Sequence, residues 1–363
     1  MNNVVGNSNE IAIALFIKTG PLSPRDGYEL VTLLNQKFSS WLTYDVTAHL
    51  SPQGVKVILT GPYDDRMKAA IEKLGDTRLL LETLTQNDQI RQPVNAQILM
   101  AGLMSHNFDP PFTQVHLHKS PILVLVACGS QAINNPEENT ANIQYQIQNR
   151  LGSFINKYND TYPSLSDFEP HRRWIHIPER SGSIVRLYKP LHEANNRTEA
   201  LSRSLGNAII GGIGSSTIAQ ILRDEQQISY NPYSALITQA GLQWLVIEAD
   251  TTTGFEQELI HKLRELMNTG FDAEFTARNV KSAAQFMIRQ RRAAFFDPSS
   301  ALQLQLAKYD GSDPWHITNA SLEEFLDIDI FHIKQVVNKL FVYESMSLIG
   351  LSNVQEQKVF SST

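Results

Sequence analysis

The sequence predicts two α+β domains built on one plan, each a mostly antiparallel sheet packed by helices. Three observations lead to this fold class. The chain has 363 residues, of which 42% are hydrophobic, enough for two domains of ordinary size. Strand-like and helix-like patterns alternate, and the order strand, turn, strand, helix occurs twice. Between the two occurrences, the polar residues 158–170 contain two prolines and are expected to form a linker.

The first domain is expected over residues 1–157. Apolar, β-rich runs bounded by Gly or Pro predict strands. Apolar residues three and four positions apart predict helices, and a Pro and Gly turn between two strand-like runs predicts a hairpin. In order, these patterns predict a strand at 10–19, a helix at 30–41, a hairpin of 44–50 and 55–61, a helix at 67–74, mostly helical structure to 105, a strand at 122–128 and a helix at 143–155.

The second domain is expected over residues 171–363, and the same patterns apply. They predict strands at 173–177 and 183–188, a helix at 193–210, a glycine-rich turn at 211–214, a shorter helix to 226, strands at 230–238 and 242–249, mostly helices to 340 and a strand at 341–350.

The strand, turn, strand, helix units of the two halves run in parallel. Each places a tyrosine, Tyr44 or Tyr230, at the start of a hairpin, and the turn glycine lies ten or eleven residues later at Gly54 or Gly241. An amphipathic helix then follows in both units. Two homologous domains explain this order economically, and chance similarity between two generic units is the alternative.

Composition excludes several classes of protein. A formal net charge of −6 is not typical of a nucleic-acid binder. Cys128 is the only cysteine, so the chain has no internal disulfide, and its place in an apolar run predicts a buried thiol. The N-terminal residues lack a secretory signal pattern, and no apolar run is long enough to predict a membrane span. We therefore expect a cytoplasmic protein, although a periplasmic chain without its leader would look the same.

The sequence contains no catalytic motif. His116 and His118 form a His-x-His pair without a carboxylate or cysteine nearby, so a surface or packing role is favoured. His192-Glu193 begins like a zinc motif, but Asn196 stands where a second histidine is needed. Neither His-x-x-Glu-His nor a Gly-x-Ser-x-Gly turn occurs. No metal ligand, bound cofactor or catalytic residue is therefore expected in this chain.

Residues Gly211 to Ser216 form a glycine-rich turn that enters a helix. Such a turn can hold an anion on free backbone amides. The run lacks the lysine of a phosphate-binding loop, so a tight turn with Ser215 or Ser216 as N-cap is favoured. On the following helix, Arg223 points away from the apolar stripe and is free to contact something other than the core.

The run from Leu205 to Tyr230 resembles the C-terminal-half signature of the insulinase/pitrilysin family of zinc metallopeptidases. In that signature a glycine-rich turn leads to a helix ending in Leu-Arg, and a tyrosine follows seven positions after the arginine. Arg223 and Tyr230 keep this spacing, whereas Ile228 and Ser229 depart from the Leu and Gly that usually precede the tyrosine. Residues 10–74 resemble the third domain of pitrilysin-type proteins, and the region from Arg173 onward resembles the fourth.

The resemblance implies a function shared with a second subunit. Members of this family fold as two halves that enclose a chamber, and only the N-terminal half carries His-x-x-Glu-His and zinc. This chain resembles the zinc-free half. Its expected partner is a homologous subunit that carries His-x-x-Glu-His and zinc, and its expected ligand is a peptide substrate.

By the same resemblance, Arg223 and Tyr230 would hold the substrate carbonyl or stabilise the oxyanion. Read without the family, Arg223 is a solvated residue at a helix end and Tyr230 a core aromatic. The alternative functions are a scaffold subunit that has lost peptidase activity and a peptide-binding module.

Overall fold

The computed structural model describes residues 8–20, 22, 24–51, 53–84, 120–152, 168–239, 242–307, 309, 319–355 and 359. The chain forms two compact units, and both are built from a sheet packed by helices, so the predicted α+β class is confirmed. The first unit spans residues 1–163, 239–241 and 290–317, and the second spans 164–238, 242–289 and 318–363.

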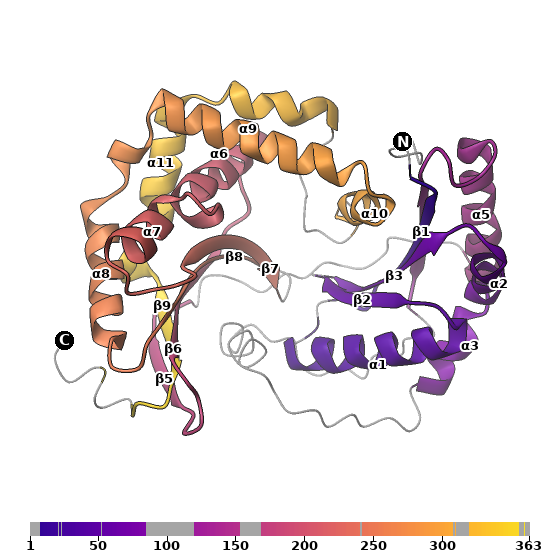
Figure 1. Ribbon diagram of the computed structural model, residues 1–363, viewed down its shortest axis with the longest axis horizontal. Coiled ribbons are helices and arrows are strands. Elements are labelled where there is room, and N and C mark those ends of the chain that lie inside the picture. Colours follow the sequence, from indigo (N-terminus) through magenta and orange to yellow (C-terminus); the bar gives the residue numbers. More distant parts are fainter. Residues whose placement is uncertain are drawn as a thin grey trace. The chain divides into compact units, whose positions relative to one another are not determined.

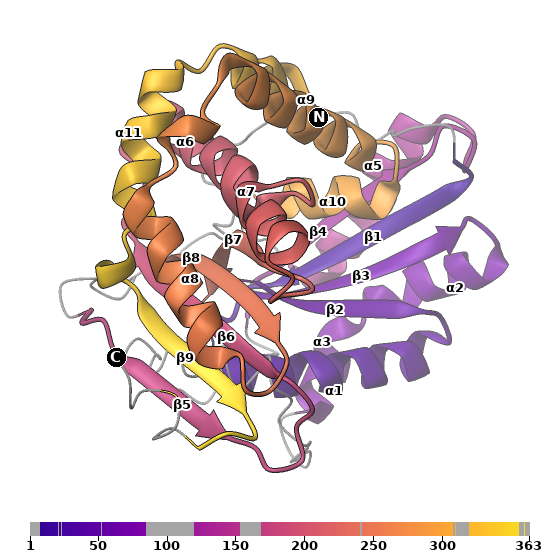
Figure 2. The same ribbon diagram turned by 60° about the vertical axis from the view of Figure 1, so that its left-hand side comes forward.

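The sheet of the first unit has four strands. They are β1 (Glu10–Ile17), β2 (Val46–Ser51), β3 (Gly54–Pro62) and β4 (Ile122–Cys128), in the order β2-β3-β1-β4. All three pairings are antiparallel, and β1, β3 and β2 run side by side in Figure 2. Ser51 pairs with Gly54 across the turn, so the predicted hairpin is confirmed.

Among the described residues, four helices cover one face of this sheet. They are α1 (Pro24–Leu42), α2 (Asp65–Leu74), α3 (Thr77–Leu84) and α5 (Pro136–Leu151). Ile11, Ile13 and Leu15 of β1 point into the core on this side, which also contains Phe38 of α1 and Met67 of α2. Burial at Cys128, the last residue of β4, raises the pKa of its thiol to about 11, as expected for a thiol inside the core.

The opposite face of the same sheet is covered by a helix from late in the chain. Ala12, Ala14 and Phe16 of β1 pack there against Leu302 and Leu306 of α10 (Pro298–Leu306). Figure 1 shows α10 on one side of β1, with α2 and α5 on the other. Residues 290–317 therefore extend the first unit beyond the range 1–157 that the sequence predicted for it, because this sheet is apolar on both faces.

The sheet of the second unit has the same plan. Its strands are β5 (Arg172–His176), β6 (Ser183–Leu191), β7 (Tyr233–Gln239), β8 (Leu242–Thr251) and β9 (Ser347–Ser352), in the order β5-β9-β6-β8-β7 (Figure 2). When β6, β7, β8 and β9 are matched to β1, β2, β3 and β4, the strand order of the two sheets is identical. In both sheets the central strand pairs antiparallel with both neighbours, so the two units repeat one topology.

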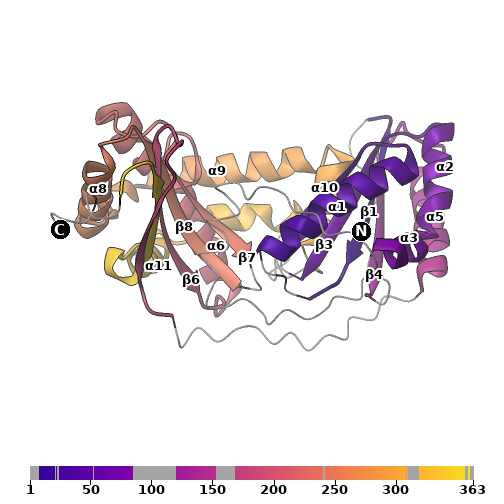
Figure 3. The same ribbon diagram turned by 90° about the horizontal axis from the view of Figure 1, so that it is seen from below.

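The helices of the second unit include a broken one that joins β6 to β7. It consists of α6 (Arg197–Asn207), a π-helical turn (Ala208–Gly212), α7 (Thr217–Ala219) and a second π-helical turn (Gln220–Glu225). By length and apolarity this stretch meets the criterion for a membrane span, but 61% of its apolar window is buried in the structure, as in a core helix. The other helices are α8 (Glu256–Thr269), which lies along β6 and β8 in Figure 3, α9 (Ala277–Ala294) and α11 (Ile330–Leu340).

Several predicted elements differ from the structure at their ends. The last strand runs from Ser347 to Ser352, because a 3₁₀ turn at Tyr343–Ser345 occupies the first part of the range predicted for it. Tyr230 precedes β7 rather than starting it. The helical stretch predicted from 85 to 105, the turn at Gly241 and residues 158–167 of the predicted linker lie outside the described residues.

We predict that Leu302→Ala weakens the first unit. Leu302 is fully buried against the sheet, so its truncation should lower the free energy of unfolding by about 3 kcal/mol. Hydrogen exchange of β1 and β4, followed by mass spectrometry, measures the effect where it is expected. Gln303→Ala, at an exposed position of the same helix, is the control. Unchanged exchange of β1 in the Leu302 variant would show that α10 does not stabilise this sheet.

Candidate functional site

The position of the site depends on how closely the broken helix approaches β7. A Cβ atom on Gly211 would lie 2.6 Å from the backbone nitrogen of Ser234, so only glycine permits this contact. Asn207, one turn earlier, is joined to the same residue. Its Oδ1 accepts a hydrogen bond of 2.7 Å from the Ser234 hydroxyl, and its Nδ2 donates to the Ser234 carbonyl at 3.3 Å. The glycine-rich segment thus fixes the helix on the strand.

Arg223 lies in the second π-helical turn. The Gln226 amide donates to the Ile221 carbonyl at 3.0 Å, which is the i to i+5 bond of a π turn. Leu222 is buried, while the side chain of Arg223 remains 37% exposed. The sequence-based expectation that Arg223 points away from the core therefore agrees with the structure, although the helix is not the regular α-helix that was predicted.

The guanidinium of Arg223 is held by two neighbours and leaves one nitrogen open. Its Nε and Nη2 donate to the two carboxylate oxygens of Asp224 at 2.8 and 3.1 Å, and Nη2 also donates to the Gly214 carbonyl at 3.1 Å. Nη1 makes no hydrogen bond that the structure describes. The Asp224 carboxylate and, to a lesser extent, the Tyr230 phenol hold the pKa of Arg223 above its usual value. Arg223 therefore stays charged and keeps two N–H groups for a ligand.

Tyr230 projects into solvent from a loop that Asp250 holds in place. The side chain of Tyr230 is 84% exposed, so it is not a core aromatic. Oδ1 of Asp250 accepts hydrogen bonds from the Ser229 hydroxyl at 3.0 Å and from the Asn231 amide at 2.8 Å. These two donors flank Tyr230 in sequence. The carboxylate thus fixes the backbone on both sides of the exposed ring.

The turn between Arg223 and Tyr230 contains a strained residue. Gln227 has a φ of 54°, in the left-handed region that favours glycine. The turn is closed by the amides of Ile228 and Ser229, which both donate to the Leu222 carbonyl, at 3.0 and 3.2 Å. The departures from the family signature at Ile228 and Ser229 therefore lie in a well-bonded turn, and the spacing from Arg223 to Tyr230 is kept.

The strand that follows the loop is also anchored. The Tyr233 hydroxyl donates to Oε1 of Glu248 at 3.2 Å, and Glu248 forms a buried ion pair with Arg186 directly across the β6 to β8 pairing. Burial and then the Glu248 carboxylate raise the pKa of Tyr233, which therefore stays protonated as a donor. The exposed Tyr230 is thus attached to a rigid part of the second sheet.

The first unit shows what the corresponding tyrosine does there. Tyr44 also precedes a hairpin, but its hydroxyl lies over Gly61, where a Cβ atom would not fit. The Arg66 guanidinium lies 5.4 Å from the centre of the Tyr44 ring. Tyr44 is therefore packed against its own domain, whereas its counterpart Tyr230 faces solvent.

The glycine-rich turn does not form a separate anion site in the part of the chain that the structure describes. The sequence favoured Ser215 or Ser216 as the N-cap, and the structure places Ser216 there, at the start of α7. Its hydroxyl makes no capping hydrogen bond. Instead the Gly214 carbonyl points to Arg223 and accepts from it. A carbonyl at this place is unfavourable for an anion, so the turn serves to position the arginine.

Three functional contributions were missed by the sequence reasoning. Asp250 lies one residue before the end of β8, and a carboxylate near a strand end was the available signal for a loop anchor. The sequence shows Asp224 only as a charged residue next to Arg223, and it does not show that the two side chains form an ion pair. The carbonyl of Gly214 gave no signal at all, because its contact with Arg223 depends on the π turn.

Within the described residues, no group of three or more His, Cys, Asp or Glu side chains is placed to hold a metal ion. His192 lies next to Arg203, which donates to its carbonyl oxygen at 2.7 Å. The His116 and His118 pair lies outside the described residues.

Comparison with known proteins finds a family match over part of the chain. Residues 117–285, which include Arg223 and Tyr230, match the family model of the peptidase M16 inactive domain. This is the family of insulinase and pitrilysin, so the predicted resemblance is confirmed. No curated protein matches the chain.

Solved structures share the fold over nearly the whole chain. A peptidase M16 inactive domain from Pseudomonas fluorescens is 14% identical with a TM-score of 0.67, over 96% of this chain and 94% of that one. A protease from Helicobacter pylori is 14% identical with a TM-score of 0.63, over 96% and 97% of the two chains. The periplasmic protease PqqL from Escherichia coli is 11% identical with a TM-score of 0.52, over 96% of this chain and 46% of its own length.

We predict that Asp250→Ala loosens the loop that carries Tyr230. The change removes two hydrogen bonds to a carboxylate, so the free energy of local opening should fall by about 2 kcal/mol. Hydrogen exchange of residues 226–232 should then rise, while exchange in β6 stays the same. Asp250→Asn keeps the Oδ1 acceptor and should change the exchange of this loop much less. Equal effects of the two substitutions would contradict the assigned anchor.

Proposed function

We propose that this chain, whose residues 117–285 carry a peptidase M16 inactive domain, acts as the non-catalytic half of a two-chain zinc peptidase. In this proposal a homologous partner supplies His-x-x-Glu-His, the zinc ion and the attacking water. The present chain binds the peptide and closes the chamber. PqqL supports the proposal, because this chain corresponds to slightly less than half of that protease's length.

The observation that carries the proposal is the exposed pair on the anchored loop. Tyr230 offers a phenolic hydroxyl that the core does not use, and Arg223 offers the open Nη1. Both groups can donate a hydrogen bond to an uncharged acceptor such as a peptide carbonyl. Because Asp224 offsets the charge of Arg223, the pair favours a directed hydrogen bond over the capture of a free anion.

The chemistry expected of the two residues follows from peptide hydrolysis. Attack on a peptide carbonyl places negative charge on its oxygen in the transition state, and positioned donors stabilise that oxygen. A donor contributes most when it is already held in place. Asp250 and the Leu222 carbonyl hold the backbone of the loop before any substrate arrives.

We predict that the chain alone binds no stoichiometric zinc and cleaves no peptide. Its described residues offer no group of metal ligands. Zinc analysis of the purified chain and a peptidase assay, without and with the partner subunit, measure this. Stoichiometric zinc in the isolated chain, or peptide cleavage by it, would contradict the proposal that the partner subunit carries the zinc site.

We predict that Arg223→Ala and Tyr230→Phe each lower kcat of the assembled peptidase by about 100- to 1,000-fold, because each removes one donor to the developing oxyanion. The fold of this chain should be unchanged, since neither side chain is buried in its core. Gln226→Ala, at an exposed position of the same loop, is the matched control. Full activity of both variants would favour a scaffold role, and peptide binding without any partner-dependent cleavage would favour a peptide-binding module.

A further inference from the structure

A cavity of about 370 Å³ opens in the second unit, away from the Tyr230 loop. It lies where β6 ends, and it is lined by residues of β6, α6 and α11. Leu191 of this cavity pairs with Gln243 at the start of β8. Asp250, which holds the Tyr230 loop, pairs with Ile184 near the far end of the same two strands. The cavity and the candidate site therefore lie at opposite ends of β8.

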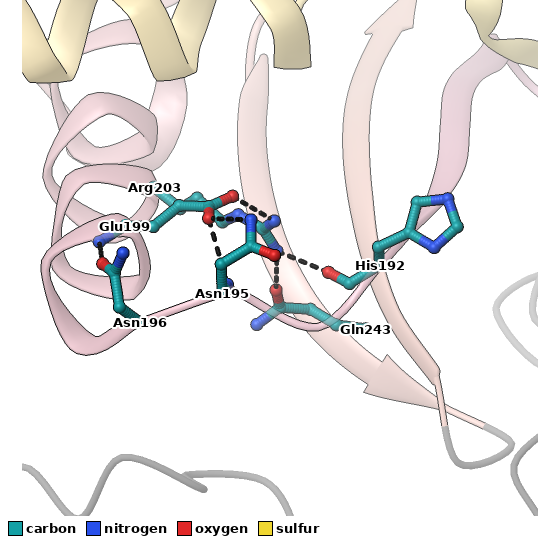
Figure 4. Close-up of polar contacts among 6 residues, drawn as sticks. All are labelled: His192, Asn195, Asn196, Glu199, Arg203 and Gln243. Atoms are coloured by element: carbon teal, nitrogen blue, oxygen red, sulfur yellow. Dashed lines mark hydrogen bonds and ion pairs between the residues drawn. The ribbon is translucent and has the colours of Figure 1, made fainter.

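One cation of the cavity is paired with a carboxylate. Arg203 is buried, and its Nη2 donates to Glu199 at 2.6 Å while Nη1 donates to the His192 carbonyl at 2.7 Å (Figure 4). Glu199 also accepts from the backbone and side-chain nitrogens of Asn195, at 3.0 and 2.7 Å. Burial acts to raise the pKa of Glu199, but the hydrogen bonds from Asn195 and Arg203 outweigh it and hold the pKa below its usual value. The carboxylate is thus committed to Arg203.

The second cation has no such partner. The Nζ of Lys189 donates to the Lys339 carbonyl at 3.0 Å and to the Ser345 hydroxyl at 3.1 Å. Among the residues that the structure describes, no carboxylate lies within ion-pair distance of this ammonium. Burial and then the charge of Arg203 lower the pKa of Lys189 to about 8. At neutral pH the group is therefore a partly buried cation with one N–H left for a ligand.

The lining combines this charge with an apolar surface. The lining contains the basic residues Lys189, Arg203 and Lys339 but one carboxylate, Glu199, which is paired with Arg203. Leu191 and Val336 belong to the apolar part of the same lining. A buried cation without a counter-ion is unfavourable, and an incoming anion relieves it. A cavity of this size takes a small molecule.

We propose that this cavity binds a small organic anion, with its acidic group at Lys189 and its apolar body against Leu191 and Val336. The acidic group is a carboxylate or a phosphomonoester, both of which accept hydrogen bonds from an ammonium. The proposal does not depend on the peptidase function, because the two sites lie at opposite ends of the sheet and share no residue.

Titration of the full chain at pH 7, followed by NMR, tests the proposal with three probes. N-acetyl-leucine carries a carboxylate and an apolar body, N-acetyl-leucinamide lacks the charge, and butyl phosphate replaces the carboxylate. At least one of the two acids should bind saturably in the millimolar range, and the amide at least tenfold more weakly. Comparison of the two acids identifies the acidic group. Equal binding of the amide, or no saturable binding by either acid, would overturn the proposal.

Lys189→Met removes the charge and keeps the aliphatic chain, so it should weaken the binding of the better acid at least tenfold. Lys334→Met, on the same α11 but outside the cavity lining, should leave the affinity unchanged. An unchanged affinity in the Lys189 variant would show that the anion binds elsewhere.

The pH dependence gives a readout that needs no variant. Binding requires protonated Lys189, so above pH 8 the affinity should fall about tenfold per pH unit. The other charged or titratable groups at the cavity are His192 after β6, Glu199 and Arg203 of α6, and His332 and Lys339 of α11. A constant affinity from pH 7 to pH 9.5 would exclude Lys189 as the group that binds the anion.

Discussion

The sheet of the first unit is apolar on both faces, and this constraint determines where residues late in the chain must go. Along β1, Ile11, Ile13 and Leu15 face one set of helices while Ala12 and Phe16 face the other side. A strand buried on both faces leaves neither open to water, so each face needs its own cover. The helices near the strands in sequence cover one face, and α10 covers the second. The first unit is therefore complete only after about 300 residues of the chain have been made.

The two units use one topology for different purposes. Both place a tyrosine just before the second strand of the repeat, but the close contact between Tyr44 and Gly61 uses that ring for packing. At the equivalent place in the second unit, the polar contacts of Asp250 hold the backbone and leave the ring of Tyr230 free. A duplicated fold thus supplies stability in one copy and a presented side chain in the other.

The local elements could be predicted from sequence, and the long-range contacts could not. The hairpin of β2 and β3 was found because alternation and turn residues are local signals. The pairing of Phe16 with α10 had no local signal, because the continuous apolar run of β1 shows that both faces are covered without showing by what. The π turn at Arg223 was missed for a related reason. A helical wheel assumes 3.6 residues per turn, whereas the bond from Gln226 to Ile221 shifts the residues that follow.

Local charge balance separates the two ligand sites of the second unit. At the loop, Asp224 lies against Arg223 and offsets its charge. The remaining N–H and O–H donors therefore bind a ligand through directional hydrogen bonds rather than through a net positive charge. This suits an uncharged peptide carbonyl, whose oxygen becomes negative only during reaction. At the cavity, Glu199 offsets Arg203, but no carboxylate among the described residues offsets Lys189, so a net positive charge remains there. That arrangement attracts an anion in its ground state. In our two proposals the loop therefore acts on a transition state and the cavity on a stable ligand, and the placement of a single carboxylate distinguishes them.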